Sequence, residues 1–142
     1  PYGMYAVGNK APLNVWFQRE YRKAYKEQPS QPGYQYAQGI LAAKYAYDKA
    51  AKANGGKFPS TDQVIKALEG ATFQSIAGTV KMALSHGHQA VTEDLWGVSV
   101  WSEKMGEPVV KDVITFPASC VMPPDGVKSV DWIKGGMKGA KC

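Results

Sequence analysis

The stretch YQYAQGILAAKYAYDKAAKA, which runs from Tyr34 to Ala53, determines how the rest of the chain is interpreted. Apolar residues on one face of a helix recur every three or four positions. Here they are Tyr36, Ile40, Ala43, Tyr47 and Ala50. Alanine is abundant in the stretch and has the highest helix propensity of all residues. The sequence therefore predicts a long helix with one apolar stripe through Tyr36.

A second amphipathic helix is predicted upstream, over residues 11–27. Leu13, Phe17 and Tyr21 follow the helical spacing, and basic residues occupy the opposite side. The link to the long helix ends at Gly33 and contains two prolines, each of which disfavours helix in the residue before it. The long helix is therefore expected to begin only after Gly33.

A third, shorter helix is predicted downstream. Ser60 and Gln63 have the spacing of a capping box, in which each side chain bonds the backbone of the other residue. Helical apolar spacing then continues as far as Leu68, and Gly70 ends it. The first half of the chain is therefore predicted to be helical.

The apolar period changes after this helix. Trp96, Val98 and Val100 alternate with other residues, and residues 109–116 form a β-branched run. Both patterns predict strands, and the loop 103–108 between them is short enough for a hairpin. The mixed segment 73–84 is interpreted as a loop with at most a short strand. After Pro117 the tail has no clear period, although its apolar residues suggest one last docked turn, and these are Val130, Trp132 and Ile133.

Composition limits the class of protein. The chain has 142 residues, is 44% hydrophobic and carries a net charge of +5, which fits one domain or part of one. Its lysines are scattered and only two residues are arginine, so nucleic acid is not expected as a partner. No apolar run approaches the roughly 20 residues of a membrane span. The sequence starts at Pro1, without an initiator Met or a signal peptide. We therefore expect the chain to be a piece of a longer protein.

Few residues offer reaction chemistry. His86 and His88 are the only imidazoles, and their spacing resembles no standard metal site. The sequence contains no nucleophile elbow, phosphate-binding loop or dinucleotide fingerprint. We therefore expect no catalytic residues, no metal and no cofactor. An enzyme would need one of these histidines beside carboxylates such as Glu93 or Asp94.

Tyrosines at loop ends are the better candidates for a binding site. Tyr2, Tyr5, Tyr34 and Tyr36 lie where a ring can line a cleft and keep its polar tip in water. The alternative is that Tyr36, on the stripe of Ile40, simply packs the helix. Spacing alone leaves both interpretations open.

Two cysteines lie in the irregular tail. Cys120 and Cys142 are able to pair in an oxidising compartment, where a loop of this size would add roughly 3 kcal/mol of stability. Two unpaired thiols in a reducing compartment are the alternative, and a count of two cysteines does not decide between them.

The order of these features resembles the C-terminal part of type I periplasmic solute-binding proteins of ABC importers, the leucine/isoleucine/valine-binding group. The segments that carry the resemblance are Phe17 to Lys26, Tyr34 to Ala50, Val64 to Gly70, Gly78-Thr79-Val80, His88-Gln89-Ala90 and Trp96 to Trp101. Together they span essentially the whole chain. The resemblance implies an α/β fold of two lobes that close on a small solute by a hinge.

The resemblance divides the chain in two and implies its function. Residues 1–93 would form the helical part of the first lobe, and residues 94–142 would supply hinge strands and a tail that pass to the second lobe. Tyr34 and Tyr36 would contact the solute, a hydrophobic amino acid or an aromatic carboxylate, and Cys120 and Cys142 would form a disulfide.

Location and partners follow in the same way. The protein would be periplasmic, would deliver its solute to the membrane permease of an ABC transporter and would perform no bond chemistry. A ligand-sensing receptor of the same fold and a non-catalytic interaction module are the alternatives. Since the chain corresponds to less than half of a family member, its uncovered apolar faces are also expected to make it self-associate.

Overall fold

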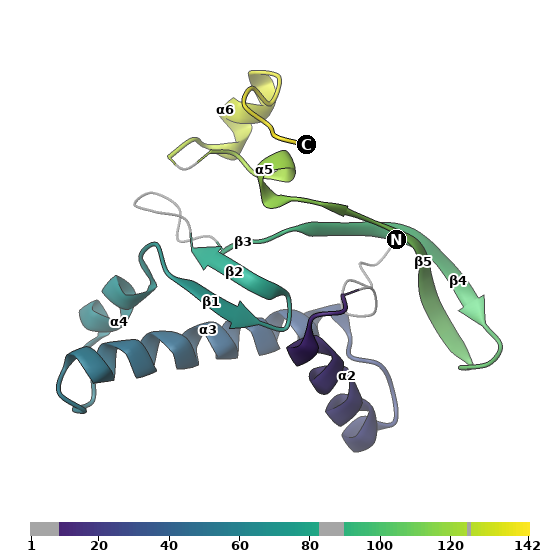
Figure 1. Ribbon diagram of the computed structural model, residues 1–142, viewed down its shortest axis with the longest axis horizontal. Coiled ribbons are helices and arrows are strands. Elements are labelled where there is room, and N and C mark those ends of the chain that lie inside the picture. Colours follow the sequence, from purple (N-terminus) through teal and green to yellow (C-terminus); the bar gives the residue numbers. More distant parts are fainter. Residues whose placement is uncertain (1–8, 83–89, 125) are drawn as a thin grey trace.

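The computed structural model describes residues 9–82, 90–124 and 126–142 (Figure 1). The helices in this part of the chain are α2 (Pro12–Tyr25), α3 (Gln31–Ala53), α4 (Thr61–Leu68), α5 (Ala118–Val121) and α6 (Ser129–Lys134). The strands are β1 (Thr72–Ser75), β2 (Gly78–Met82), β3 (Ala90–Val91), β4 (Asp94–Ser102) and β5 (Glu107–Phe116). The three predicted helices in the first half and the strand pair that follows are therefore confirmed.

The long helix α3 begins earlier than predicted, at Gln31 instead of after Gly33. Ser30 is its N-cap, and the Ser30 side chain accepts a hydrogen bond from the backbone N–H of Gly33 at 3.2 Å. Pro32 lies in the first turn, where a helix needs no N–H donor from that residue. Proline therefore starts this helix, and the prediction that it delays the helix is wrong.

The capping box of α4 is confirmed. The Gln63 backbone N–H donates to Ser60 Oγ at 3.3 Å, and the Ser60 backbone N–H donates to Gln63 Oε1 at 2.8 Å. These bonds satisfy two donors that the start of a helix otherwise leaves without intrahelical partners.

The core lies between α3 and a β-hairpin that the sequence did not predict. β1 and β2 pair antiparallel, with Phe73 opposite Val80, and both side chains are buried. The Phe73 ring stacks on Tyr45 of α3, with centroids 5.2 Å apart. A short third strand, β3, adds to β2. Strands of four and five residues contain too few inward positions to show a period, so the sequence predicts only a loop with at most a short strand over residues 73–84.

The face of α3 that packs on this hairpin is not the stripe through Tyr36, Ile40 and Tyr47. Tyr34 belongs to the core cluster, and Ala37, Leu41 and Tyr45 pack against it. Tyr36, Ile40 and Tyr47 are exposed instead. The helix is apolar on more than one side, and helical spacing does not indicate which side another element covers.

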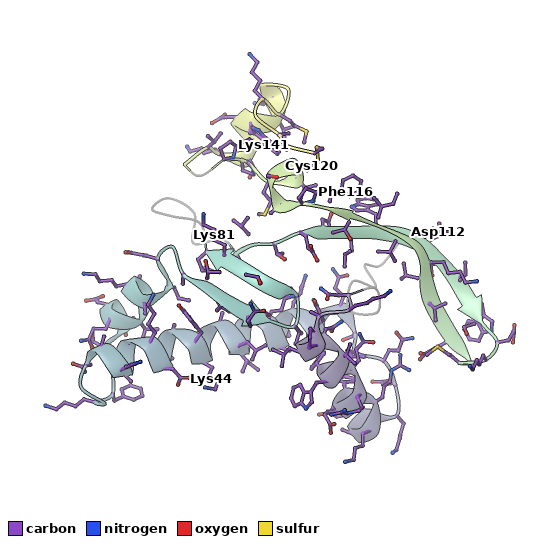
Figure 2. All side chains as sticks on the ribbon, viewed as in Figure 1. Lys44, Lys81, Asp112, Phe116, Cys120 and Lys141 are labelled. Atoms are coloured by element: carbon purple, nitrogen blue, oxygen red, sulfur yellow. A yellow bond between two sulfur atoms is a disulfide. The ribbon has the colours of Figure 1, made fainter. Side chains whose placement is uncertain are left out.

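β4 and β5 form a long antiparallel ribbon that leads from β3 to a tip that contacts α2 and the link after it (Figure 1). Its register shifts between Trp96 and Val98, because β5 carries an extra residue there. Asp112 lies at this bulge with a φ of 51° (labelled in Figure 2). Gly97 is opposite, where an added Cβ would lie 2.3 Å from Val110 Cγ1 and 2.8 Å from the backbone oxygen of Lys111. Only glycine therefore fits at this point of the ribbon.

The C-terminal residues form a small unit with two short helices. Trp132 of α6 is buried, and its indole N–H donates to the backbone oxygen of Lys138 at 2.9 Å. The last docked turn expected at this tryptophan is thus confirmed. The tail is more regular than predicted, since α5 also forms.

Candidate functional site

The two candidate tyrosines of α3 lie on opposite sides of the helix. Positions two apart on an α-helix are rotated by about 200° from each other. Tyr34 is 2% exposed, and its ring packs edge-on against Phe17, with centroids 6.4 Å apart. Tyr36 is 76% exposed. The structure therefore does not bring these two side chains together, and only Tyr36 presents a ring to the surface.

Tyr36 belongs to an exposed apolar surface, the outer face of α3, formed by Tyr36, Ile40, Ala43 and Tyr47. Phe58 extends this face beyond the end of the helix, because its ring lies 5.6 Å from that of Tyr47. Phe58 is 83% exposed. Contiguous exposed rings of this kind are typical of surfaces that bind a ligand or another polypeptide.

Sequence reasoning missed Phe58. The only signal for it was a single apolar residue between the helix-ending glycines and the next N-cap.

One ion pair lies beside this surface. Lys44 (labelled in Figure 2) pairs with Asp48 one turn further along α3. Both side chains are largely exposed, so the pair contributes little to stability. It does place a cation and a carboxylate at the border of the outer face. Exposed rings beside a cation and a carboxylate can make apolar and polar contacts with a ligand or another polypeptide.

A polar cluster is buried where α2 begins and the β1–β2 hairpin turns. Asn9, Asn14 and Ser75 are all buried, and the Asn14 side-chain N–H donates to the backbone oxygen of Asn9 at 2.7 Å. Ser75 Oγ has no hydrogen-bond partner among the described residues. Short polar residues next to turns are common in any sequence, which is why this cluster was not predicted.

Cys120 and Cys142 form a disulfide, with Cα atoms 4.6 Å apart. Beside it, Ser119 and Lys141 exchange two hydrogen bonds of 2.9 Å (Cys120 and Lys141 are labelled in Figure 2). The covalent link and these bonds join the end of the chain to α5.

Several candidates named from the sequence lie outside the described residues, and these are Tyr2, Tyr5, His86 and His88. Within residues 9–82, 90–124 and 126–142, no three His, Cys, Asp or Glu side chains are grouped so that they could hold a metal ion. None of the helices in this same part of the chain is long and apolar enough to cross a membrane.

No family model and no curated protein matches the chain. Solved structures do. An ABC-type branched-chain amino acid transporter from Rhodopseudomonas palustris CGA009 superimposes with a TM-score of 0.70 and 21% identity, over 89% of this chain and 32% of that one. A solute-binding protein of an ABC transporter from Rhodopseudomonas palustris BisB5, in complex with 3,4-dihydroxybenzoic acid, superimposes with a TM-score of 0.62 and 20% identity, over 79% of this chain and 29% of that one.

The chain spans about a third of the length of these structures. The match includes most of the chain, although the sequences are only about one-fifth identical. The chain therefore has the fold of part of an ABC-transporter solute-binding protein.

Proposed function

We propose that this chain is part of the solute-binding component of an ABC importer and performs no bond chemistry. The observation that carries the proposal is the superposition of 89% of the chain on such a protein. One structural neighbour is described as a branched-chain amino acid transporter, and the other holds an aromatic carboxylate. The proposed solute of this protein is correspondingly a hydrophobic amino acid or an aromatic carboxylate. The proposed location is the periplasm, and the proposed partner is a membrane permease.

Within this function, we assign the solute contact to Tyr36. Its ring is exposed near the start of α3, and Ile40 lies one turn along the same face. Tyr34 would act indirectly, because its buried ring packs α3 against Phe17 of α2 and so holds that part of the helix in place.

The division of the chain belongs to the same proposal. Residues 1–93 would contribute to one lobe, and residues 94–142 would begin with hinge strands. The ribbon of β4 and β5 supports this division, since none of its residues belongs to the core cluster and it leads at its base to the C-terminal unit (Figure 1).

Calorimetry of the intact protein tests the binding role. We expect heat of binding with 3,4-dihydroxybenzoate or with leucine, and a weaker affinity by about tenfold in Tyr36→Ala, since stacking on an aromatic ring typically contributes 0.5–1.5 kcal/mol beyond its buried area. Tyr25→Ala is the control, because Tyr25 is also exposed but lies on α2. If neither class of solute binds, the binding role is refuted. If Tyr36→Ala and Tyr25→Ala bind the solute with the same affinity, the assignment of the contact to Tyr36 is refuted.

The exposed apolar faces of this chain also favour binding to another polypeptide, in addition to solute binding. The outer face of α3 and the exposed ribbon residues Trp96 and Trp101 have no cover within the described residues. We propose that this 142-residue chain, studied alone, self-associates through the outer face. In sedimentation, the mass should exceed 15.4 kDa and should fall toward it in Ile40→Asp. Gln35→Asp adds the same charge at another exposed position of α3 and should change little. A monomeric parent chain would contradict the proposal.

A further inference from the structure

The tip of the β4–β5 ribbon contacts the helices through two polar interactions. Arg22 Nη1 of α2 lies 2.6 Å from Glu107 Oε1, at the start of β5. The Gln28 side-chain N–H, from the link between α2 and α3, donates to the backbone oxygen of Pro108 at 3.2 Å. The two pairs join residues that are 85 and 80 positions apart in the sequence. Neither was expected from any pattern in the sequence.

The ion pair differs from the other ion pairs of the helices in its burial. The side chains of Arg22 and Glu107 are 33% and 18% exposed, whereas those of Arg19 and Glu20, also paired on α2, are 68% and 40% exposed. Glu107 Oε1 itself has almost no solvent contact. Exposed pairs contribute little, but a carboxylate that is mostly removed from water depends on its cation.

The ribbon needs such an anchor. An isolated two-stranded ribbon is marginally stable in water, and both strands of this one carry exposed apolar side chains, among them Trp96, Val98 and Ile114. At its base, the ribbon is continuous with the chain, since β4 follows β3 and β5 leads through Pro117 to α5. At its tip, the side chains of Arg22 and Gln28 connect it to α2 and to the link that follows α2.

The contacts at the tip lie on the far side of a bulge from the base of the ribbon. The bulge at Gly97 and Asp112 lies between the base and the tip, and a bulge bends a strand and increases its twist. The chain connections at the base and the contacts of Arg22 and Gln28 at the tip together fix the orientation of the ribbon.

We propose that Arg22, Glu107 and Gln28 form a clasp that holds the β4–β5 ribbon as a strap against the end of α2. Arg22 and Glu107 are positioning residues in this device. When the clasp opens, the ribbon swings about its base while the core between α3 and the β1–β2 hairpin stays intact. The clasp is independent of the proposed solute, because none of its residues belongs to the outer face of α3.

Hydrogen exchange with charge-reversal variants tests the clasp. In Arg22→Glu and in Glu107→Arg, two like charges meet, and the backbone amides of residue 107, Val109 and Val110 should exchange about tenfold faster. The amides of β1 and β2 should keep their rates. The double variant restores opposite charges and should return the ribbon to within about threefold of the parent rate. Arg19→Glu, the matched control on the same helix, should leave the ribbon unchanged.

A milder variant covers the case in which a reversal unfolds the protein. Arg22→Gln removes the cation without a like-charge pair, and it should raise the exchange of the Glu107, Val109 and Val110 amides more than that of β1 and β2. Equal ribbon exchange in Arg22→Gln and in the parent would overturn the proposal. A double charge-reversal variant that folds but exchanges as fast as either single variant would overturn it as well.

Discussion

Replacing Tyr34 with alanine should lower the free energy of unfolding by about 3–5 kcal/mol, the range found for large aromatic side chains removed from a core. The ring is 2% exposed and lies in the cluster formed with Phe73, Ile76 and Val80. Its loss leaves a cavity between α3 and the hairpin, and it removes the contact with Phe17 that joins α2 to α3. Urea denaturation followed by circular dichroism measures this change.

Tyr36→Ala is the matched control, since it removes the same side chain two positions along the same helix. Tyr36 is 76% exposed, so its removal should change the free energy of unfolding by less than about 0.5 kcal/mol. Similar losses in both variants would show that the outer face of α3 is covered in the protein under study. A negligible loss in Tyr34→Ala would contradict the position of the core described above.

Removing the disulfide should have the second large effect. The double variant Cys120→Ser and Cys142→Ser, which leaves no free thiol, should lose about 3 kcal/mol of stability in the C-terminal unit, because the bond closes a loop of 22 positions. The loss is expected to be local. Trp132 supplies the buried ring of this unit, and no core residue of the hairpin belongs to it.

Hydrogen exchange of α6 measures this second effect, and a reductant provides the control. Amides of α6 should exchange faster in the double variant and in the reduced parent, while the β1–β2 hairpin stays protected. The reductant should then have no further effect on the double variant. Unchanged protection of α6 in that variant would show that Trp132 and the hydrogen bonds of Ser119 hold the unit without the covalent link.

The helices were predictable because their signals are local. The Ser60–Gln63 capping box and the helical spacing through Phe17 depend only on neighbours in the sequence. The β1–β2 hairpin was not predictable, since its strands derive their stability from α3 and not from their own pattern. The same coupling explains why the sequence left the buried side of α3 open, since apolar residues line both sides and the position of the hairpin decides which side is buried.

The candidate site was predictable only in part. Of the two tyrosines of α3 expected to contact the solute, only Tyr36 is exposed, and its contact with a solute stays a prediction. Phe58 and the clasp residue Glu107 were not expected, because both acquire their surroundings from residues that are distant in the sequence or on another element. The buried position of Tyr34 likewise depends on Phe17 from the preceding helix.

Fluorine NMR of the intact protein labelled with fluorotyrosine tests the central claim most directly. The chain has eight tyrosines, and the Tyr36→Phe variant assigns the resonance of Tyr36 by its absence. On saturation with the solute that binds by calorimetry, the resonance of Tyr36 should shift, whereas that of exposed Tyr25 on α2 should not. An unshifted Tyr36 resonance with the solute fully bound would contradict the assignment of the outer face of α3 to the binding site.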